Sequence, residues 1–168
     1  MNDGFEQEDW LRQAALEEQT EAVKSAALKY ISVRMRTKNE VESFLHKKNY
    51  PAELIEEVIA FLLRYQYLDD AAYCRAWIHD KLAFHPCGRK KMAMELAKKV
   101  SDKQLIRDSL EEYFPEEQER ALALEAANQK LRSHTGKKQT GREQIARFLY
   151  GRGYSGTVIG HVLQELDL

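Results

Sequence analysis

The amino-acid sequence predicts an all-α fold of tandem three-helix repeats that form an elongated molecule. Only 8 Gly and 3 Pro occur among 168 residues, so few residues interrupt helices. No segment alternates apolar and polar residues with the two-residue period of a strand. The sequence also matches itself at regular offsets, which is typical of a repeat architecture.

The internal repeat is most evident in segment 44–59, FLHKKNYPAELIEEVI, which returns as FLYGRGYSGTVIGHVL at 148–163. A fainter copy lies about halfway between the two, where Leu105 corresponds to Leu54. Three units of about fifty residues follow from these offsets. We expect an acidic helical extension at 1–24 and three-helix repeats at 25–68, 69–114 and 115–168.

Three helices are expected in each unit because apolar residues recur at steps of three and four. In the first unit these steps run through 28–35, then 41–45, then 54–62. The first helix of the third unit is expected to be long, from about Pro115 to Arg132. Each unit is thus a single supersecondary element.

The turn between the last two helices of a unit is predicted from its residue types. Asn49 and Gly153 stand where a helix C-terminus requires positive φ. Lys99 replaces the small residue in the middle unit, so that turn should be built differently. The residues suited to begin the next helices are Pro51, Ser101 and Ser155.

The first and second units meet at Asp69 and Asp70, which suit the positive end of the following helix. A Mg²⁺ site at these two carboxylates is the less favoured alternative, because adjacent residues point in different directions. The least ordered stretches are expected at 1–5, 85–88 and 133–141, where turn-forming residues break the helical pattern.

Charged residues are sorted along the chain, although the net charge is only −1. Residues 1–24 carry seven acids against two bases, and residues 108–119 carry six acids and no base. Residues 85–107 carry seven bases against two acids, and 130–152 carry seven against one; a weaker basic stretch covers 34–48. Such sorting can place basic faces on a molecule of nearly neutral charge.

Basic residues recur at or near the second helix of every unit. If the units stack with a regular rotation, these residues form a stripe suited to phosphates or to an acidic protein groove. For any single cluster, the alternative is a solvated helix face with acidic partners one turn away. The predicted binding residues are Arg34, Arg36, Lys38, Arg89, Lys90, Lys91, Lys98, Lys99, Arg142, Arg147 and Arg152.

No catalytic motif occurs in the sequence: there is no phosphate loop, GxGxxG, nucleophile elbow or HExxH. We therefore predict no enzymatic activity and no cofactor. Four residues of soft-metal type lie within fourteen positions but lack paired zinc-ligand spacing, so no metal site is predicted and both cysteines should be free thiols. These four are Cys74, His79, His85 and Cys87.

Several aromatic residues could stack on nucleic-acid bases, but aromatics at helical spacing usually fill the space between helices. Most of them are therefore expected in the core. The six are Trp10, Tyr30, Tyr50, Tyr65, Tyr67 and Trp77.

The N-terminus has no apolar signal region, and no apolar run approaches the roughly 20 residues of a membrane span. We expect a cytoplasmic monomer with no membrane partner.

Three features together resemble the RecX family of recombination regulators. They are the repeated FL-x-x-(K/R)-(N/G)-Y pattern, the junction Tyr67-Leu68-Asp69-Asp70 followed by Ala71-Ala72-Tyr73, and the run Gly88-Arg89-Lys90-Lys91 leading to Glu95-Leu96. The resemblance covers roughly residues 26–166. It departs from the family at Asn49 and Lys99, where glycine is usual.

The resemblance implies tandem three-helix repeats in an elongated, curved molecule that binds the RecA recombinase filament on DNA and suppresses its activities, without catalysis. ATP hydrolysis, strand exchange and filament extension are the activities that a filament-bound protein would inhibit. Two alternatives remain: a helical nucleic-acid-binding protein without a recombinase partner, and a helical scaffold whose basic stripe is incidental. The acidic segments 1–24 and 108–119 favour the recombinase partner over a pure DNA binder.

Overall fold

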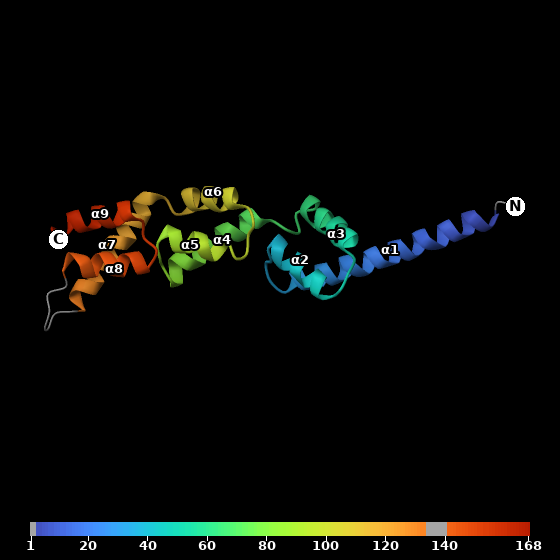
Figure 1. Ribbon diagram of the computed structural model, residues 1–168, viewed down its shortest axis with the longest axis horizontal. Helices are drawn as coiled ribbons and strands as arrows, with labels where there is room; N and C mark the ends of the chain where they lie inside the picture. Colours follow the sequence, from blue (N-terminus) through green and yellow to red (C-terminus); the bar gives the residue numbers. More distant parts are fainter. Residues whose placement is uncertain (1–2, 134–140) are drawn as a thin grey trace. The chain divides into compact units, whose positions relative to one another are not determined.

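The structure, a computed structural model, describes residues 3–133 and 141–168, and all regular elements in these ranges are α-helices (Figure 1). In chain order they are α1 (Asp3–Ser32), α2 (Lys38–Lys47), α3 (Ala52–Arg64), α4 (Asp70–Phe84), α5 (Arg89–Leu96), α6 (Lys103–Tyr113), α7 (Glu116–Arg132), α8 (Arg142–Gly151) and α9 (Gly156–Glu165). The all-α class is confirmed. The helices fall into two compact units, of which the first ends at Tyr73 and the second begins at Cys74.

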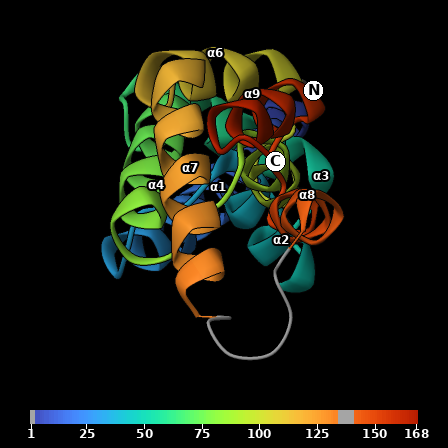
Figure 2. The ribbon, with the colours of Figure 1, turned by 90° about the vertical axis from the view of Figure 1, so that its left-hand side faces the viewer.

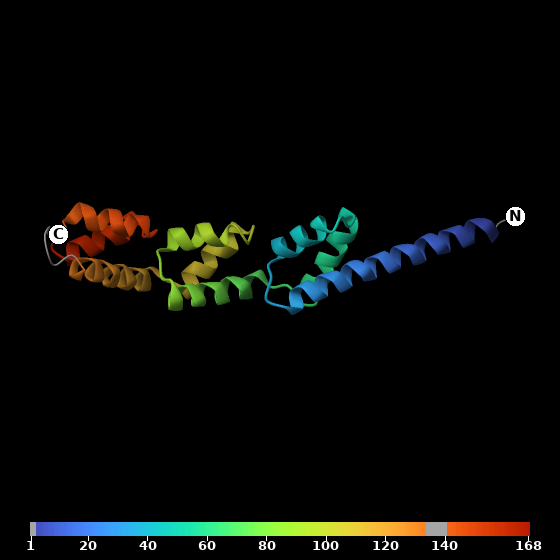
Figure 3. The same cartoon turned by 90° about the horizontal axis from the view of Figure 1, so that it is seen from below.

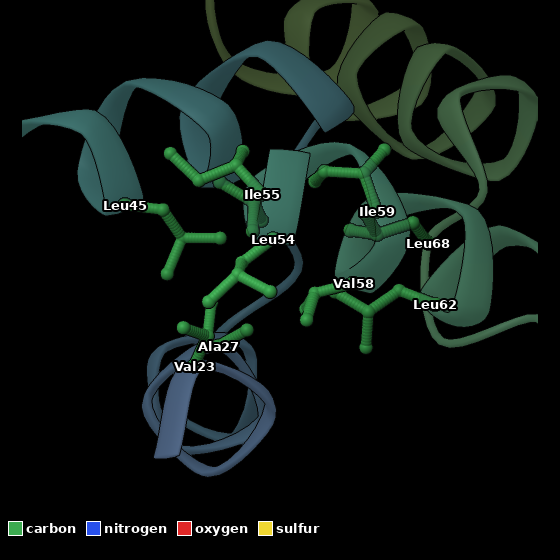
Figure 4. Close-up of a cluster of buried hydrophobic side chains, with 10 residues drawn as sticks. Val23, Ala27, Leu45, Leu54, Ile55, Val58, Ile59, Leu62 and Leu68 are labelled. Carbon is green, nitrogen blue, oxygen red and sulfur yellow. The ribbon is translucent and has the colours of Figure 1, made fainter. Parts of the chain in front are cut away.

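In the first unit, α2 and α3 pack on the C-terminal half of α1 (Figure 3). Their shared core is aliphatic: α1 contributes Val23 and Ala27, and α3 contributes most of the other side chains (Figure 4). The spacing of Leu54, Ile55 and Val58 on α3 is the helical pattern that the sequence shows, and all three are buried. The prediction of a three-helix repeat here is confirmed.

The acidic extension and the first helix of the repeat form one continuous helix. α1 begins at Asp3, and almost every described side chain from residue 8 to residue 19 is exposed, whereas Val23 and Ala27 are fully buried. The expected boundary at residue 24 therefore falls inside a helix. The expected low order at 1–5 stays a prediction; from Asp3 onward these residues are part of α1.

In the second unit, α5 and α6 form one three-helix group with α4, which begins at the end of the first unit, and α7, α8 and α9, which face the viewer in Figure 2, form the next. Ion pairing between α4 and α5 (Lys81 to Glu95, 2.5 Å) and a ring contact between α4 and α6 (His79 and Tyr113, 5.8 Å) hold the first group. Alanines on α7 allow α8 and α9 to approach closely: Ala123 and Ala127 are fully buried.

The predicted positive-φ turns are present after α2 and after α8. Asn49 has φ of 60° and Gly153 has φ of 85°, and Lys99 has no positive φ. Ser155 accepts the backbone N–H of Val158 and caps α9, as expected. The prediction for Ser101 is wrong: Asp102 caps α6, because its carboxylate reaches two backbone N–H groups.

Asp69 and Asp70 serve two different helices. The carboxylate of Asp69 accepts the backbone N–H of Ala72 at 2.9 Å and so caps α4. The carboxylate of Asp70 accepts the backbone N–H of Lys38 at 2.9 Å, at the start of α2. The second contact joins segments 32 residues apart and was not expected from the sequence.

The N-terminus of α5 is held by segments that lie far along the chain. The backbone N–H of Arg89 donates to the buried carboxylate of Glu119 on α7 at 2.8 Å. The N–H of Gly88 donates to the carbonyl of Arg152 at 2.9 Å, and the N–H of Lys90 donates to the carbonyl of Gly153 at 3.2 Å. The turn after α8 thus lies against the start of α5 (Figure 1).

Two further expectations fail or go untested. In the connection 85–88, Cys87 and Gly88 are buried whereas His85 and Pro86 are exposed, so the expected low order holds for its first half at most; the connection 133–141 lies mostly outside the described residues. The aromatic residues are not core either: Trp10, Tyr65 and Tyr67 are more than half exposed. Tyr30, Tyr50 and Trp77 are only partly buried, because aliphatic side chains fill the space between these helices.

Candidate anion-binding interface

Several of the predicted binding residues are engaged within the fold. Three of them form ion pairs: Arg34 with Glu40 at 2.9 Å, Lys38 with Glu42 at 3.6 Å, and Arg89 with Glu111 at 2.5 Å. Of these three pairs, only Lys38–Glu42 has the i,i+4 spacing of the alternative interpretation, a helix face with an acidic partner one turn away; the other two join residues 6 and 22 positions apart. Arg142 donates to the main-chain carbonyl of Leu168.

Besides Arg36, five of the predicted residues have no carboxylate within 4 Å anywhere in residues 3–133 or 141–168. They are Lys90, Lys91, Lys98, Arg147 and Arg152. All five lie on α5, on α8, or within two residues of their ends, and all belong to the second unit. Lys99, next to Lys98, is partly buried.

Aromatic rings hold some of the cations in place. Arg152 lies over the ring of Phe148 at 4.8 Å, and Lys130 lies over the same ring at 5.5 Å. At the equivalent position of the first repeat, Lys48 lies over Phe44 at 5.8 Å. Such contacts restrict a long side chain to fewer conformations, so less entropy is lost when it meets an anion.

The first repeat extends this arrangement into a stack. Phe44 lies parallel to Tyr30, with ring centroids 4.0 Å apart and an interplanar angle of 2°. The guanidinium of Arg36 covers the outer part of the stack, 4.1 Å from the Tyr30 ring. Arg36 and Lys48 therefore sit at opposite ends of one cation–aromatic stack, although they are twelve positions apart in sequence.

A cationic hollow of about 380 Å³ opens between the end of α4, the start of α5 and the turn after α8. Lys81, Lys91 and Arg152 line it together with His85, and no carboxylate is among its lining residues. Phe84, Pro86 and Cys87 complete the wall. The hollow lies entirely within the second unit and joins cations from the second and third repeats.

The charged groups around this hollow affect the pKa of the Cys87 thiol. Burial raises the pKa of Cys87 and the carboxylate of Glu95 adds to this rise, while Lys81, Lys91 and Arg152 act in the opposite direction by favouring the thiolate. Three cations therefore act on one buried group. Lys81 already pairs with Glu95, so Lys91 and Arg152 are the lysine and arginine lining the hollow that have no ion pair among the described residues.

The backbone at the start of α5 does not take part in binding an anion. The N–H groups of Gly88, Arg89 and Lys90 already donate to protein acceptors. These three N–H groups are therefore not available to an anion, whereas the side chains of Lys91 and Arg152 line the hollow.

The sequence predicted Lys91 and Arg152 as members of separate clusters, and the structure brings them to one hollow. The sequence did not indicate Lys81, because a single lysine on a helix with both apolar and charged residues gives no pattern. From the sequence, His85 is considered only as a metal ligand. Among the described residues, no group of three or more side chains could hold a metal ion, and no helix has the length and apolar character that a membrane span requires.

Comparison with known proteins decides the family. Three family models, described as the first, second and third three-helix domains of RecX, match residues 24–62, 69–110 and 116–163. The chain belongs to the RecX family. The three matched segments correspond in order to α1–α3, α4–α6 and α7–α9, and together they cover most of the chain.

Curated RecX proteins are similar along nearly all of this chain. Regulatory protein RecX of Clostridium acetobutylicum is 30% identical over 162 residues, which are 94% of this chain and 75% of that protein. Regulatory protein RecX of Halalkalibacterium halodurans is 30% identical over 158 residues, and the match covers 94% of this chain but 59% of the relative. The chain thus spans about three quarters of one of these relatives and less than two thirds of the other.

A solved RecX structure has the same fold. The crystal structure of RecX from Lactobacillus salivarius matches with a TM-score of 0.80 and 25% sequence identity, over 90% of this chain and 98% of that one. The RecX family is therefore shown by sequence and by fold, and its curated members are regulatory proteins.

Proposed function

We propose that this RecX protein regulates the RecA recombinase by binding the RecA–DNA filament through the cations of α5 and α8. Bound there, it inhibits DNA-dependent ATP hydrolysis, strand exchange and filament extension. The observation that carries the proposal is membership of a regulatory family together with cations from two repeats that face one hollow.

The charge pattern supports binding to a polyanionic partner, but not tight binding to DNA alone. Lys90, Lys91, Arg147 and Arg152 have no carboxylate within 4 Å among the described residues, so they can meet phosphates or acidic side chains without first breaking an ion pair. The chain as a whole carries a charge of −1, which opposes strong binding to naked DNA. A filament of protein and DNA suits a molecule that has unpaired cations on one surface but almost no net charge.

The repeat architecture supports a preference for the filament over the free protomer. Three repeats in one chain place several contact surfaces under a single covalent connection. Once one repeat is bound, the others act at a high effective concentration, provided that the target presents neighbouring sites. Only an assembled filament does so.

The test is the rate of ATP hydrolysis by RecA on single-stranded DNA, measured as this protein is added. We expect the rate to fall at near-stoichiometric ratios, and strand exchange to fall with it. Raising the salt concentration should weaken the inhibition, because exposed cation contacts are screened and release counterions. Unchanged hydrolysis at saturating protein, together with tight binding to naked DNA, would instead establish the nucleic-acid-binding alternative.

A further inference from the structure

We infer that the hollow between α4, α5 and the turn after α8 is a subsite for one nucleotide of a single strand: its cations bind the phosphodiester and Phe84 stacks on the base. The inference deepens the proposed function and rests on it for the part that this surface plays in the filament. It assigns a ligand and a stacking residue to a place that the sequence did not single out.

The cations have the arrangement that a phosphodiester requires. Lys91 enters from α5 and Arg152 from the turn after α8, and His85 lies between the helix ends. The planar guanidinium of Arg152 can donate two parallel hydrogen bonds to phosphate oxygens, while lysine acts as a point charge. A volume of about 380 Å³ is sufficient for a phosphate and its sugar, and the hollow is open to solvent on one side.

Rigid surroundings keep this site in place. Arg152 is supported by the ring of Phe148 at 4.8 Å, and its carbonyl accepts the N–H of Gly88 at 2.9 Å. Lys91 packs against Gly153, where there is no room for a side chain. The two cations therefore come from backbone segments that are hydrogen-bonded to each other, so the backbone that carries them is held in place before a ligand binds.

Phe84 is the second observation that points to a nucleotide. It lines the hollow, yet 73% of its surface is exposed to solvent, which is among the highest values for a large apolar residue in the described chain. An aromatic ring beside a cationic groove is the combination that binds single strands: the cations follow the backbone and the ring stacks on a base.

A single strand fits this site better than a duplex does. In a duplex the bases are stacked on each other and hidden from an exposed ring, so Phe84 would gain nothing. In a single strand one base can leave its neighbours and cover Phe84, which buries apolar surface on both partners. An acidic peptide would use the cations and leave Phe84 unused.

The experiment measures binding of a fluorescently labelled oligothymidine of about 20 nucleotides to the full chain by anisotropy, in the absence of RecA, and repeats it with a duplex of the same length. Phe84→Ala should weaken single-strand binding about tenfold and leave duplex binding within about twofold, since stacking contributes only to the single strand. Phe84→Trp should restore or exceed wild-type binding. Lys91→Ala with Arg152→Ala should weaken both and reduce the dependence on salt.

Matched controls test the location. Tyr150→Ala removes an equally exposed aromatic (70%) from α8, outside the lining of the hollow, and Lys103→Ala removes an exposed lysine of the same unit. Both should bind as the wild type does, and all variants should melt as the wild type does. The inference is overturned if Phe84→Ala binds the oligonucleotide within twofold of wild type, or if Tyr150→Ala weakens binding as much. Failure of the proposed function has a different signature, which is unchanged ATP hydrolysis by RecA at saturating protein.

Discussion

The second helices of the first two repeats begin in different ways. At α2, Thr37 accepts the N–H of Glu40, and the carboxylate of Glu40 accepts the N–H of Thr37, each at 3.2 Å, so residues of the helix itself satisfy its start. At α5 the corresponding residue is Gly88, which has no side chain to offer. The N–H groups at the start of α5 donate instead to Glu119 and to carbonyls of the turn after α8.

One type of contact is nevertheless common to the two helix starts. In both cases a carboxylate from the first helix of the following repeat accepts an N–H at the start of the second helix: Asp70 for α2, and Glu119 for α5. At α2 this contact supplements a local cap. At α5 it replaces one, so we expect the second repeat to depend on the third for its stability.

The largest effect should follow from closing the space at the start of α5. A Cβ atom at Gly88 would overlap the carbonyl oxygen of Gly153 and the backbone nitrogen of Tyr154. Gly88→Ala should therefore destabilise the second unit by about 3 kcal/mol, as overpacking of rigid backbone does. Urea unfolding followed by circular dichroism measures this change.

Gly141→Ala is the matched control, because a Cβ atom there meets nothing within 4 Å. Like Gly88, Gly141 precedes a helix that has no side-chain cap. Equal losses of stability in the two variants would show that the close approach of α5 to the turn after α8 contributes little.

A smaller effect is expected at Glu119. Glu119→Ala leaves the N–H of Arg89 buried without its acceptor and should cost about 2 kcal/mol. Glu119→Gln keeps an acceptor oxygen and should cost less. Thermal melting of both variants beside the wild type distinguishes the two, and equal losses would contradict the assigned hydrogen bond.

The same residue predicts a pH dependence. Burial raises the pKa of Glu119 above its ordinary value of 4.5, so the folded protein binds this proton more tightly than the unfolded chain does. Its contribution to stability is therefore greatest at low pH and falls as the pH rises from about 4.5 through the raised pKa. Glu119→Gln should lack this part of the pH profile.

The smallest effect is expected at Asp70, because α2 keeps its own cap. Asp70→Ala removes the acceptor of the Lys38 N–H and should destabilise the first unit by about 1 kcal/mol. Thr37→Ala, which breaks the local capping box, should cost at least as much. A larger loss for Asp70→Ala than for Glu119→Ala would reverse the comparison between the two helix starts.

Sequence reasoning predicted the parts of this protein that depend on local chemistry. Helical spacing located the buried faces of α2 and α3, and the requirement for positive φ identified Asn49 and Gly153. The face expected at 28–35 is wrong in part, because α1 ends at Ser32 and Met35 is exposed. These features involve residues within one or two turns of each other, which a linear pattern can record.

What the sequence did not predict depends on contacts between distant segments. Nothing near Gly88 indicates that its N–H meets the carbonyl of Arg152, 64 residues later, and Glu119 reads as one more acid in an acidic run. For the same reason the hollow was not predicted: its cations belong to different repeats and meet only in the fold. The expected elongated, curved shape, the domain boundaries, the monomeric state and the cytoplasmic location stay predictions.

The most direct test of the central claim compares two double charge reversals in the inhibition of RecA. Lys91→Glu with Arg152→Glu changes the two principal cations of the hollow, and Lys103→Glu with Arg120→Glu makes the same change in charge at exposed positions of the same unit. We predict that the first variant loses inhibition of ATP hydrolysis on single-stranded DNA by at least tenfold in half-inhibitory concentration. The second should inhibit as the wild type does, within about twofold, because it leaves the hollow intact. Equal inhibition by both variants, with both folded, would contradict the claim that this surface binds the filament.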